Sequence, residues 1–109
     1  MEWEVLFDVE FNDWFEALEQ GLQDEIWVHI ELLQQLGPNL GRPRVDTVKS
    51  SAYPNMKELR IQYRGDPWRI LFAFDPGRDA ILLVGGNKRG NKKWYAEQIR
   101  IARRRSFWG

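Results

Sequence analysis

The sequence contains no cysteine and a single histidine, His29. Without cysteine there is no disulfide framework and no thiolate nucleophile, which fits the reducing cytoplasm. One histidine in an acidic helical segment argues against a Cys/His zinc site and against a Ser-His-Asp triad. Because His29 follows Ile26 by three residues and borders an apolar helical stripe, we expect it to have a packing or solvent role.

Several nucleotide-binding and targeting signals are also missing. The chain has no P-loop and no GxGxxG motif, and no apolar run approaches the ~20 residues of a membrane span. Its first residues, MEWE, lack the basic start and apolar run of a secretory signal. We therefore expect a cytoplasmic protein with no membrane segment, no metal and no cofactor.

Positive charge is absent from the first 41 residues, which hold ten Asp and Glu but no Lys or Arg. The remaining residues hold sixteen Lys and Arg against six acidic residues, so the two parts carry formal charges of −10 and +10. Such a split favours a basic face that binds a polyanion. The alternative is that the two parts simply neutralise each other within one fold.

The spacing of apolar residues predicts an α+β fold in a single domain, residues 1–109. We expect a small antiparallel sheet, made of an N-terminal strand plus a three-stranded meander, with the helices on one side. An N-terminal helical hairpin would pack on this sheet, and a short C-terminal helix would follow. The expected strands are 2–9, 57–64, 68–74 and 80–84, the helices are 12–21, 22–36 and 94–102, and 38–55 is an irregular connection.

The stretch from Trp68 to Arg89 is expected to form the central β-hairpin. Its turn, residues 75–78, has the sequence DPGR, and Pro followed by Gly at the two central positions predicts a type II turn. The run 80–84 is apolar at every position, which predicts a central strand covered on both faces. Gly85-Gly86 predicts a close backbone approach or a bulge.

Two arginines on neighbouring strands are the first candidates for function. Pairing Tyr63 with Trp68 puts the apolar residues of both strands on one face. Arg60 would then lie opposite Leu71, and Arg69 opposite Gln62, so that the two arginines are diagonal neighbours roughly 7–8 Å apart. Two guanidinium groups on a mostly apolar face need an anion, from the protein or from a ligand.

The residues after the hairpin add more basic groups and an aromatic ring. Such a site binds phosphates, and aromatic faces can stack on unpaired bases. Fixed Arg and Lys donors can stabilise the charge that builds when an RNA 2′-hydroxyl attacks its own phosphate. Glu58 and Asp66 are the acids at hand, and ion pairs with nearby arginines are their expected role. The alternative is a surface patch that makes nonspecific contacts. The basic and aromatic candidates are Arg60, Arg69, Lys88, Arg89, Lys92, Lys93 and Tyr95.

Four segments together resemble the RelE/ParE superfamily of bacterial toxins, and most of all its phage-derived HigB-type branch. They are LGRP-VD at 40–46, KELR at 57–60, WRILFAFDP-R-AILLVGG-K-G at 68–90 and WY---I--A at 94–102. The resemblance covers roughly residues 3–102 in the same element order. It implies a type II toxin that enters the ribosome, cuts mRNA without a metal and is neutralised by a helix-turn-helix antitoxin of the HigA type.

The resemblance also implies roles for individual residues. Arg60 would bind the scissile phosphate, and Arg69 would stabilise the developing charge. Lys88 would act as a base or a phosphate clamp, and Tyr95 as a stacking or proton-transfer residue. The basic side chains expected to bind RNA around them are Arg89, Lys92, Lys93, Arg64 and Lys57.

The chain departs from its relatives in two places. Gly86 stands where many relatives carry an aromatic residue, and no histidine lies near the C-terminus. Two other functions remain open at this point. One is a ParE-like toxin that binds DNA gyrase without catalysis, and the other is a non-toxic interaction module.

Overall fold

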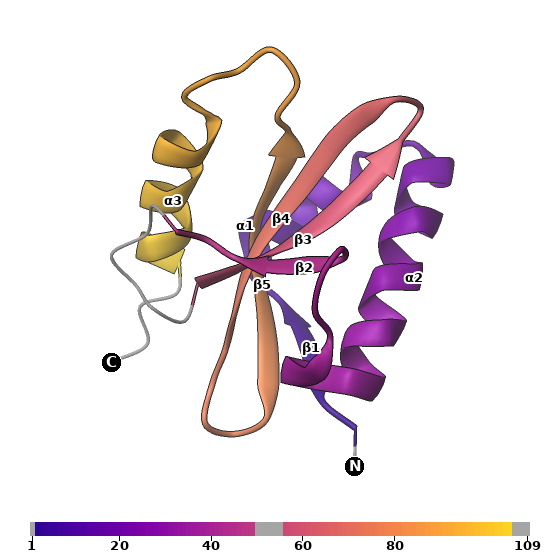
Figure 1. Ribbon diagram of the computed structural model, residues 1–109, viewed down its shortest axis with the longest axis vertical. Coiled ribbons are helices and arrows are strands. Elements are labelled where there is room, and N and C mark those ends of the chain that lie inside the picture. The colour runs from indigo at the N-terminus through magenta and orange to yellow at the C-terminus, as the bar shows by residue number, and fades with distance from the viewer. Residues whose placement is uncertain (1, 50–55, 106–109) are drawn as a thin grey trace.

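A five-stranded sheet with helices on both faces forms the protein (Figure 1). The computed structural model describes residues 2–49 and 56–105. The strands lie in the order β1-β5-β4-β3-β2; β1 runs parallel to β5, and all other neighbours are antiparallel. The elements are β1 (Glu4–Phe7), α1 (Val9–Glu16), α2 (Gln20–Leu36), a 3-10 turn (Gly37–Asn39), β2 (Val45–Thr47), β3 (Met56–Tyr63), β4 (Asp66–Phe74), β5 (Asp79–Asn87) and α3 (Trp94–Arg105).

The predicted α+β architecture is confirmed, including the meander β3-β4-β5 and the central position of β5. The sheet is not wholly antiparallel as predicted, because β1 pairs parallel to β5, and it has a fifth strand, β2. The prediction that all helices lie on one side is wrong for α3. Helices α1 and α2 cover one core, which includes Leu82, whereas α3 covers a second core that includes Leu83. Because successive residues of β5 point to opposite faces and are both apolar, the sheet needs a helical layer on each side.

Asp8 separates the first strand from the first helix. Its carboxylate accepts hydrogen bonds from the backbone N–H groups of Glu10 and Phe11, at 3.0 and 3.3 Å, which is the geometry of a helix N-cap. The helix therefore starts at Val9, several residues before the expected cap at Asn12 or Asp13. The period-two pattern was misleading because its last apolar residue, Val9, already belongs to the helix.

Helix α2 carries the apolar stripe that its spacing predicts. Leu22, Ile26, Ile30 and Leu33 are all buried against the sheet. His29 is 6% exposed, and its Nδ1 donates to the backbone carbonyl of Glu25 at 2.9 Å, so it packs as expected.

Among the described residues, no helix has the length and apolarity needed to cross a membrane.

The segment 38–55, expected to be irregular, begins within the 3-10 turn and contains the short strand β2. Residues 50–55 of this segment lie outside the described residues. β2 pairs with β3, Val45 lying opposite Leu59 and Thr47 opposite Lys57. β2 has only three residues and follows a stretch of Gly, Arg and Pro, so it is too short to show a period in the sequence.

The β3–β4 hairpin has a tighter turn than expected, so the predicted register is wrong by two residues. Tyr63 pairs with Asp66 rather than with Trp68. The two turn residues, Arg64 and Gly65, have φ angles of 50° and 81°, as a type I′ turn requires. A shift of two residues keeps every side chain on its predicted face, because the side-chain period of a strand is two.

The β4–β5 turn also differs from the prediction. Gly77 does not adopt a positive φ, whereas Arg78 does, at 67°. The backbone of Asp75 bonds to that of Asp79, and the Asp75 carboxylate accepts from the N–H groups of Gly77 and Asp79 at 2.9 and 3.0 Å. The loop therefore has three residues and a left-handed last position rather than a type II turn.

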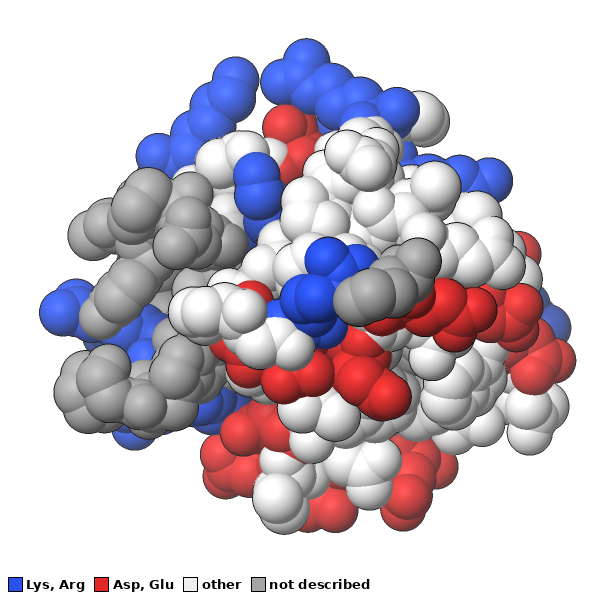
Figure 2. Space-filling model, turned by 90° about the horizontal axis from the view of Figure 1, so that it is seen from below, with Lys and Arg blue, Asp and Glu red and all other residues white. Residues whose placement is uncertain are grey.

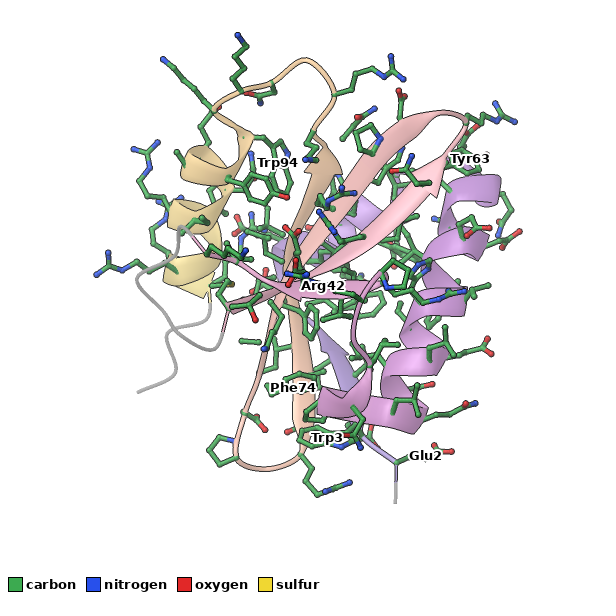
Figure 3. All side chains as sticks on the ribbon, viewed as in Figure 1. Glu2, Trp3, Arg42, Tyr63, Phe74 and Trp94 are labelled. Carbon is green, nitrogen blue, oxygen red and sulfur yellow. The ribbon has the colours of Figure 1, made fainter. Side chains whose placement is uncertain are left out.

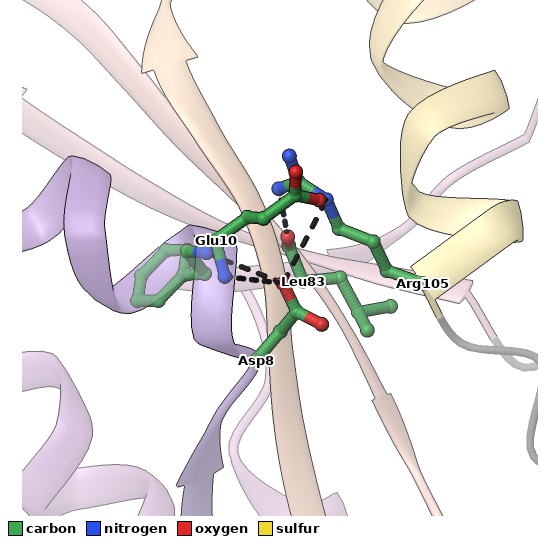
Figure 4. Close-up of polar contacts among 5 residues, drawn as sticks. Asp8, Glu10, Leu83 and Arg105 are labelled. Atoms are coloured by element: carbon green, nitrogen blue, oxygen red, sulfur yellow. Dashed lines mark hydrogen bonds and ion pairs between the residues drawn. The ribbon is translucent and has the colours of Figure 1, made fainter.

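Arg105, at the end of α3, contacts the start of α1 (Figure 4). Its guanidinium donates to the carbonyl of Leu83 at 2.7 Å and to the carboxylate of Glu10 at 3.0 Å, and it lies 3.7 Å from Asp8. Only 19% of its side chain is exposed. These contacts hold the helix against β5 from its last described turn.

The two glycines at the end of β5 permit the close approach that the sequence predicts, one on each face of the sheet. A Cβ atom on Gly85 would lie 2.5 Å from the ring of Trp14, and one on Gly86 would lie 2.7 Å from Nε1 of Trp94. In Figure 3, Trp94 lies at the start of α3 beside the end of β5. The space over Gly86 is thus filled by Trp94.

We predict that Gly85→Ala lowers the free energy of unfolding by roughly 1–3 kcal/mol, because the Trp14 ring must move from its contacts with Phe11 and Trp68. Urea unfolding measures the change. Gly41→Ala is the matched control, since its Cβ would meet nothing within 4 Å. Equal midpoints for the two variants would contradict the prediction.

Candidate functional site

Arg60 and Arg69 lie directly opposite each other in the β3–β4 ladder, on the face covered by α3. The sequence placed them as diagonal neighbours; the two-residue shift brings them closer, to the roughly 4.5–5.5 Å between backbones of direct partners. Arg69 is 7% exposed, and its guanidinium donates to the carbonyl of Trp68 at 2.9 Å. The Arg60 side chain is 37% exposed, so it is the member of the pair that solvent can reach.

Glu58 is the anion that this arginine pair needs. One carboxylate oxygen, Oε1, lies 3.2 Å from Nε of Arg60 and 3.9 Å from Nε of Arg69. The carboxylate is buried, and its other oxygen, Oε2, has no hydrogen-bond partner, nor do the two Nε atoms. One carboxylate against two guanidinium groups leaves a net positive charge, so the site can still receive a phosphate.

Tyr95 joins this cluster from the first turn of α3. Burial raises the pKa of Tyr95, and a hydrogen bond to Glu58 raises it further, while the nearby Arg69 acts in the opposite direction. Lys88, in the loop after β5, lies with Nζ 5.3 Å from the centre of the Tyr95 ring. The structure thus brings together the four predicted catalytic residues, and it adds Glu58 between them.

We predict that Tyr95 stays protonated at neutral and mildly alkaline pH. Its pKa is raised above the ordinary 10.0, so its contribution to stability is fully present below pH 10 and is lost as pH rises through the folded value. The tyrosinate absorbance of the wild type minus that of Tyr95→Phe measures this titration. A difference step at or below pH 10 would contradict the prediction.

The five predicted RNA-binding residues divide into two sets. Lys92 and Lys93 are exposed in the loop before α3, and Arg89 precedes them. Arg89 forms an ion pair with Asp66 and donates to the carbonyl of Gly65 at 2.6 Å, which confirms the expected role of Asp66. These three residues lie in the same β5–α3 connection as Lys88.

Lys57 and Arg64 are not brought to this cluster. Lys57 lies two residues before Leu59 in β3, so both side chains point to the same face, opposite to that of Arg60. There the Nζ of Lys57 donates to the hydroxyl of Thr47 at 3.0 Å. Arg64 lies at the hairpin tip, 3.7 Å from Glu19. In Figure 3 the adjacent Tyr63 lies beside the start of α2, away from Trp94.

Two cavities meet at Arg60. The α2-side cavity, of ≈ 480 Å³, is lined by Glu25, His29, Pro43, Arg44, Arg60, Gln62 and Arg69. The α3-side cavity, of ≈ 320 Å³, is lined by Asp46, Thr47, Val48, Lys49, Glu58, Arg60 and Tyr95.

Sequence reasoning missed most residues of both cavities. Their segment, 43–49, adjoins β3 because the N–H of Arg60 donates to the carbonyl of Arg44 at 2.8 Å. No periodicity in that Gly- and Pro-containing stretch signals this contact.

The charge split in the sequence is partly visible on the surface. On the face seen from below, acidic side chains gather toward the lower edge and the right, and Lys and Arg lie mainly at the top and the left (Figure 2). Ion pairs also join the two parts of the chain, as between Arg105 and Glu10 or between Arg64 and Glu19. The two parts of the chain therefore neutralise each other in part, as the second alternative predicts.

The fold is that of the RelE toxins. A solved structure of a mutant E. coli toxin RelE in the free state superimposes with a TM-score of 0.67, covering 98% of this chain and 100% of that chain, at 11% sequence identity. At this identity the likeness concerns the fold alone.

The chain belongs to the phage-derived Gp49-like protein family, whose profile matches residues 13–106. It is 53% identical over 94 residues to a candidate toxin of Mycobacterium tuberculosis named HigB3, a match that covers 85% of this chain and 81% of that protein. A second candidate toxin of the same organism, HigB2, is 47% identical over 98 residues; the match covers 87% of this chain but only 49% of HigB2. The predicted place in the RelE superfamily, in its HigB-like branch, is thereby confirmed.

Proposed function

We propose that this chain is the toxin of a type II toxin–antitoxin system and that it cuts mRNA on the ribosome in the cytoplasm. The observation that supports this most directly is the pair Arg60 and Arg69, held on facing positions of two strands with only one carboxylate, Glu58, between them. The pair is buried on one side and open to two cavities on the other.

The reaction needs no covalent enzyme intermediate. The RNA 2′-oxygen forms a bond to phosphorus, the bond from phosphorus to the 5′-oxygen breaks, and a 2′,3′-cyclic phosphate remains. Arg60 would hold the phosphate, and Arg69 would stabilise the charge that develops on its oxygens. A fixed guanidinium suits this role because it stays protonated and donates in a fixed geometry.

Two protons must move in this reaction. The 2′-hydroxyl loses one, and the departing 5′-oxygen gains one. Because the pKa of Tyr95 is raised, its hydroxyl is suited to donate a proton or a hydrogen bond rather than to act as the base. Lys88 is close to the Tyr95 ring and can serve as the base or as a phosphate clamp.

The proposed partners are the ribosome with its mRNA and a HigA-like helix-turn-helix antitoxin. A non-catalytic gyrase-binding toxin would need neither a facing arginine pair nor cavities beside it, so the site does not favour that function.

Inducible expression of the chain alone tests the proposal. We expect growth arrest, with cleavage of mRNAs that are being translated and no cleavage of the same transcript when its start codon is removed. Arrest with intact mRNA would contradict RNA cleavage, and absence of arrest would contradict the toxin function. The neighbouring gene should encode a protein that relieves the arrest.

A further inference from the structure

Arg60 lies on the ridge between the two cavities, because both are lined by its side chain. A single-stranded RNA alternates phosphates with nucleosides, so a protein that grips one phosphate needs room for a nucleoside on each side of it. The proposed function uses Arg60 for the phosphate and Tyr95, which lines the α3-side cavity, as a donor, but it gives the α2-side cavity no role beyond that of the arginine pair.

The α2-side cavity has the dimensions and the lining of a nucleoside site. Its volume of ≈ 480 Å³ lies within the range of small-molecule pockets. Pro43 and the ring of His29 provide flat, largely apolar surfaces, and the Gln62 amide provides both a donor and an acceptor. Arg44, whose backbone carbonyl accepts from the N–H of Arg60, adds a third guanidinium to the lining of the same cavity, where a neighbouring phosphate can bind.

The hydrogen-bonding groups that α2 contributes to this cavity are acceptors. The Glu25 carboxylate only accepts when ionised. His29 uses its Nδ1 to donate to the carbonyl of Glu25, so in the neutral ring Nε2 is left as an acceptor. Cytosine, adenine and guanine carry exocyclic amino groups with two N–H donors for such acceptors, whereas uracil offers only its single ring N3–H.

We propose that the α2-side cavity is a nucleoside subsite next to the scissile phosphate, that Arg44 binds the following phosphate, and that Glu25 favours bases bearing an exocyclic amino group over uracil. This inference rests on the proposed function, since it takes Arg60 and Arg69 to hold the scissile phosphate. It adds a specificity-determining residue that lies outside the predicted catalytic set.

Binding of two matched RNAs tests the inference without requiring cleavage. The probes are fluorescein-labelled 2′-O-methyl RNA hexamers, one all cytidine and one all uridine, which cannot be cut because their 2′-oxygens cannot attack. They are titrated with the purified chain at pH 7.5. We expect the wild type to bind the cytidine hexamer at least threefold more tightly than the uridine hexamer.

Variants then separate base recognition from general attraction. Glu25→Gln should reduce the preference for cytidine to less than half its wild-type ratio, because an amide can also donate to the uracil carbonyl. Arg44→Ala should weaken both hexamers equally and reduce the slope of log affinity against log salt by about 0.7, as for one lost phosphate contact on a single strand. Arg104→Ala is the control, an exposed arginine on α3 outside both cavities, and should change neither quantity.

Equal binding of the two hexamers by the wild type would overturn the inference, and so would a preference that survives Glu25→Gln. A loss of salt dependence in Arg104→Ala as large as in Arg44→Ala would indicate diffuse attraction and would also overturn it. Failure of the proposed function is a separate outcome, namely intact mRNA in cells that express the wild type.

Discussion

Arg60→Ala is expected to slow mRNA cleavage by a factor of about 10²–10³ while the protein stays folded, because one fixed donor to a developing anion contributes this much to catalysis. The fold should survive since the Arg60 side chain is 37% exposed and Glu58 keeps Arg69 as a partner. Growth arrest should be abolished at expression levels at which the wild type arrests cells. Primer extension on a translated reporter mRNA measures the remaining cleavage.

The matched control is Arg104→Ala, which removes an exposed arginine of the same charge from α3. We expect this variant to keep cleavage within about threefold of the wild type. If both variants lost activity equally, the overall positive charge would matter rather than the arginine pair. If Arg60→Ala kept wild-type cleavage, the mechanism proposed for this site would be wrong.

Removing Glu58 should have the largest effect on stability. Glu58→Ala leaves the guanidinium of Arg69 buried without its counterion, and breaking a buried pair in this way costs roughly 3–5 kcal/mol. We expect a corresponding fall in the urea midpoint. At equal protein concentration, a larger unfolded fraction would also weaken the toxic phenotype.

Glu58→Gln separates the charge of this residue from its shape. The amide keeps the size of the side chain and can hydrogen-bond to Tyr95, but it no longer neutralises the arginines. We expect it to be less destabilising than Glu58→Ala and to bind phosphate-containing RNA more tightly, with slower cleavage because the guanidinium groups are no longer aligned. Thermal unfolding of Glu58→Ala that matched the wild type would contradict this account of the cluster.

The alternation of side chains between the two faces of a strand explains why the arginine pair could be predicted from the sequence. Apolar residues alternate in both strands, so Arg60 and Arg69 had to share the face opposite to Leu59 and Ile70. Their exact pairing could not be predicted, because it depends on a two-residue turn in which Arg64, not a glycine, takes a positive φ. The signals usual for such a turn are Asn-Gly or Asp-Gly.

The cavities show the limit of sequence reasoning more clearly. Arg44 reaches the site only because a short strand, β2, brings residues 43–49 to the edge of β3. His29 was correctly expected to pack, yet it also lines the α2-side cavity. These positions depend on tertiary contacts between segments with no shared pattern, and local propensity does not report such contacts.

The attachment of Arg105 to Glu10 has a consequence for the timing of activity during protein synthesis. These partners are separated by 95 positions along the chain, and Tyr95 lies on the helix that they secure. While the chain is still being translated, the N-terminal strand, α1 and α2 can emerge and meet long before Arg105 does. The ribosome that makes this chain therefore releases most of it before α3 can dock and complete the proposed site.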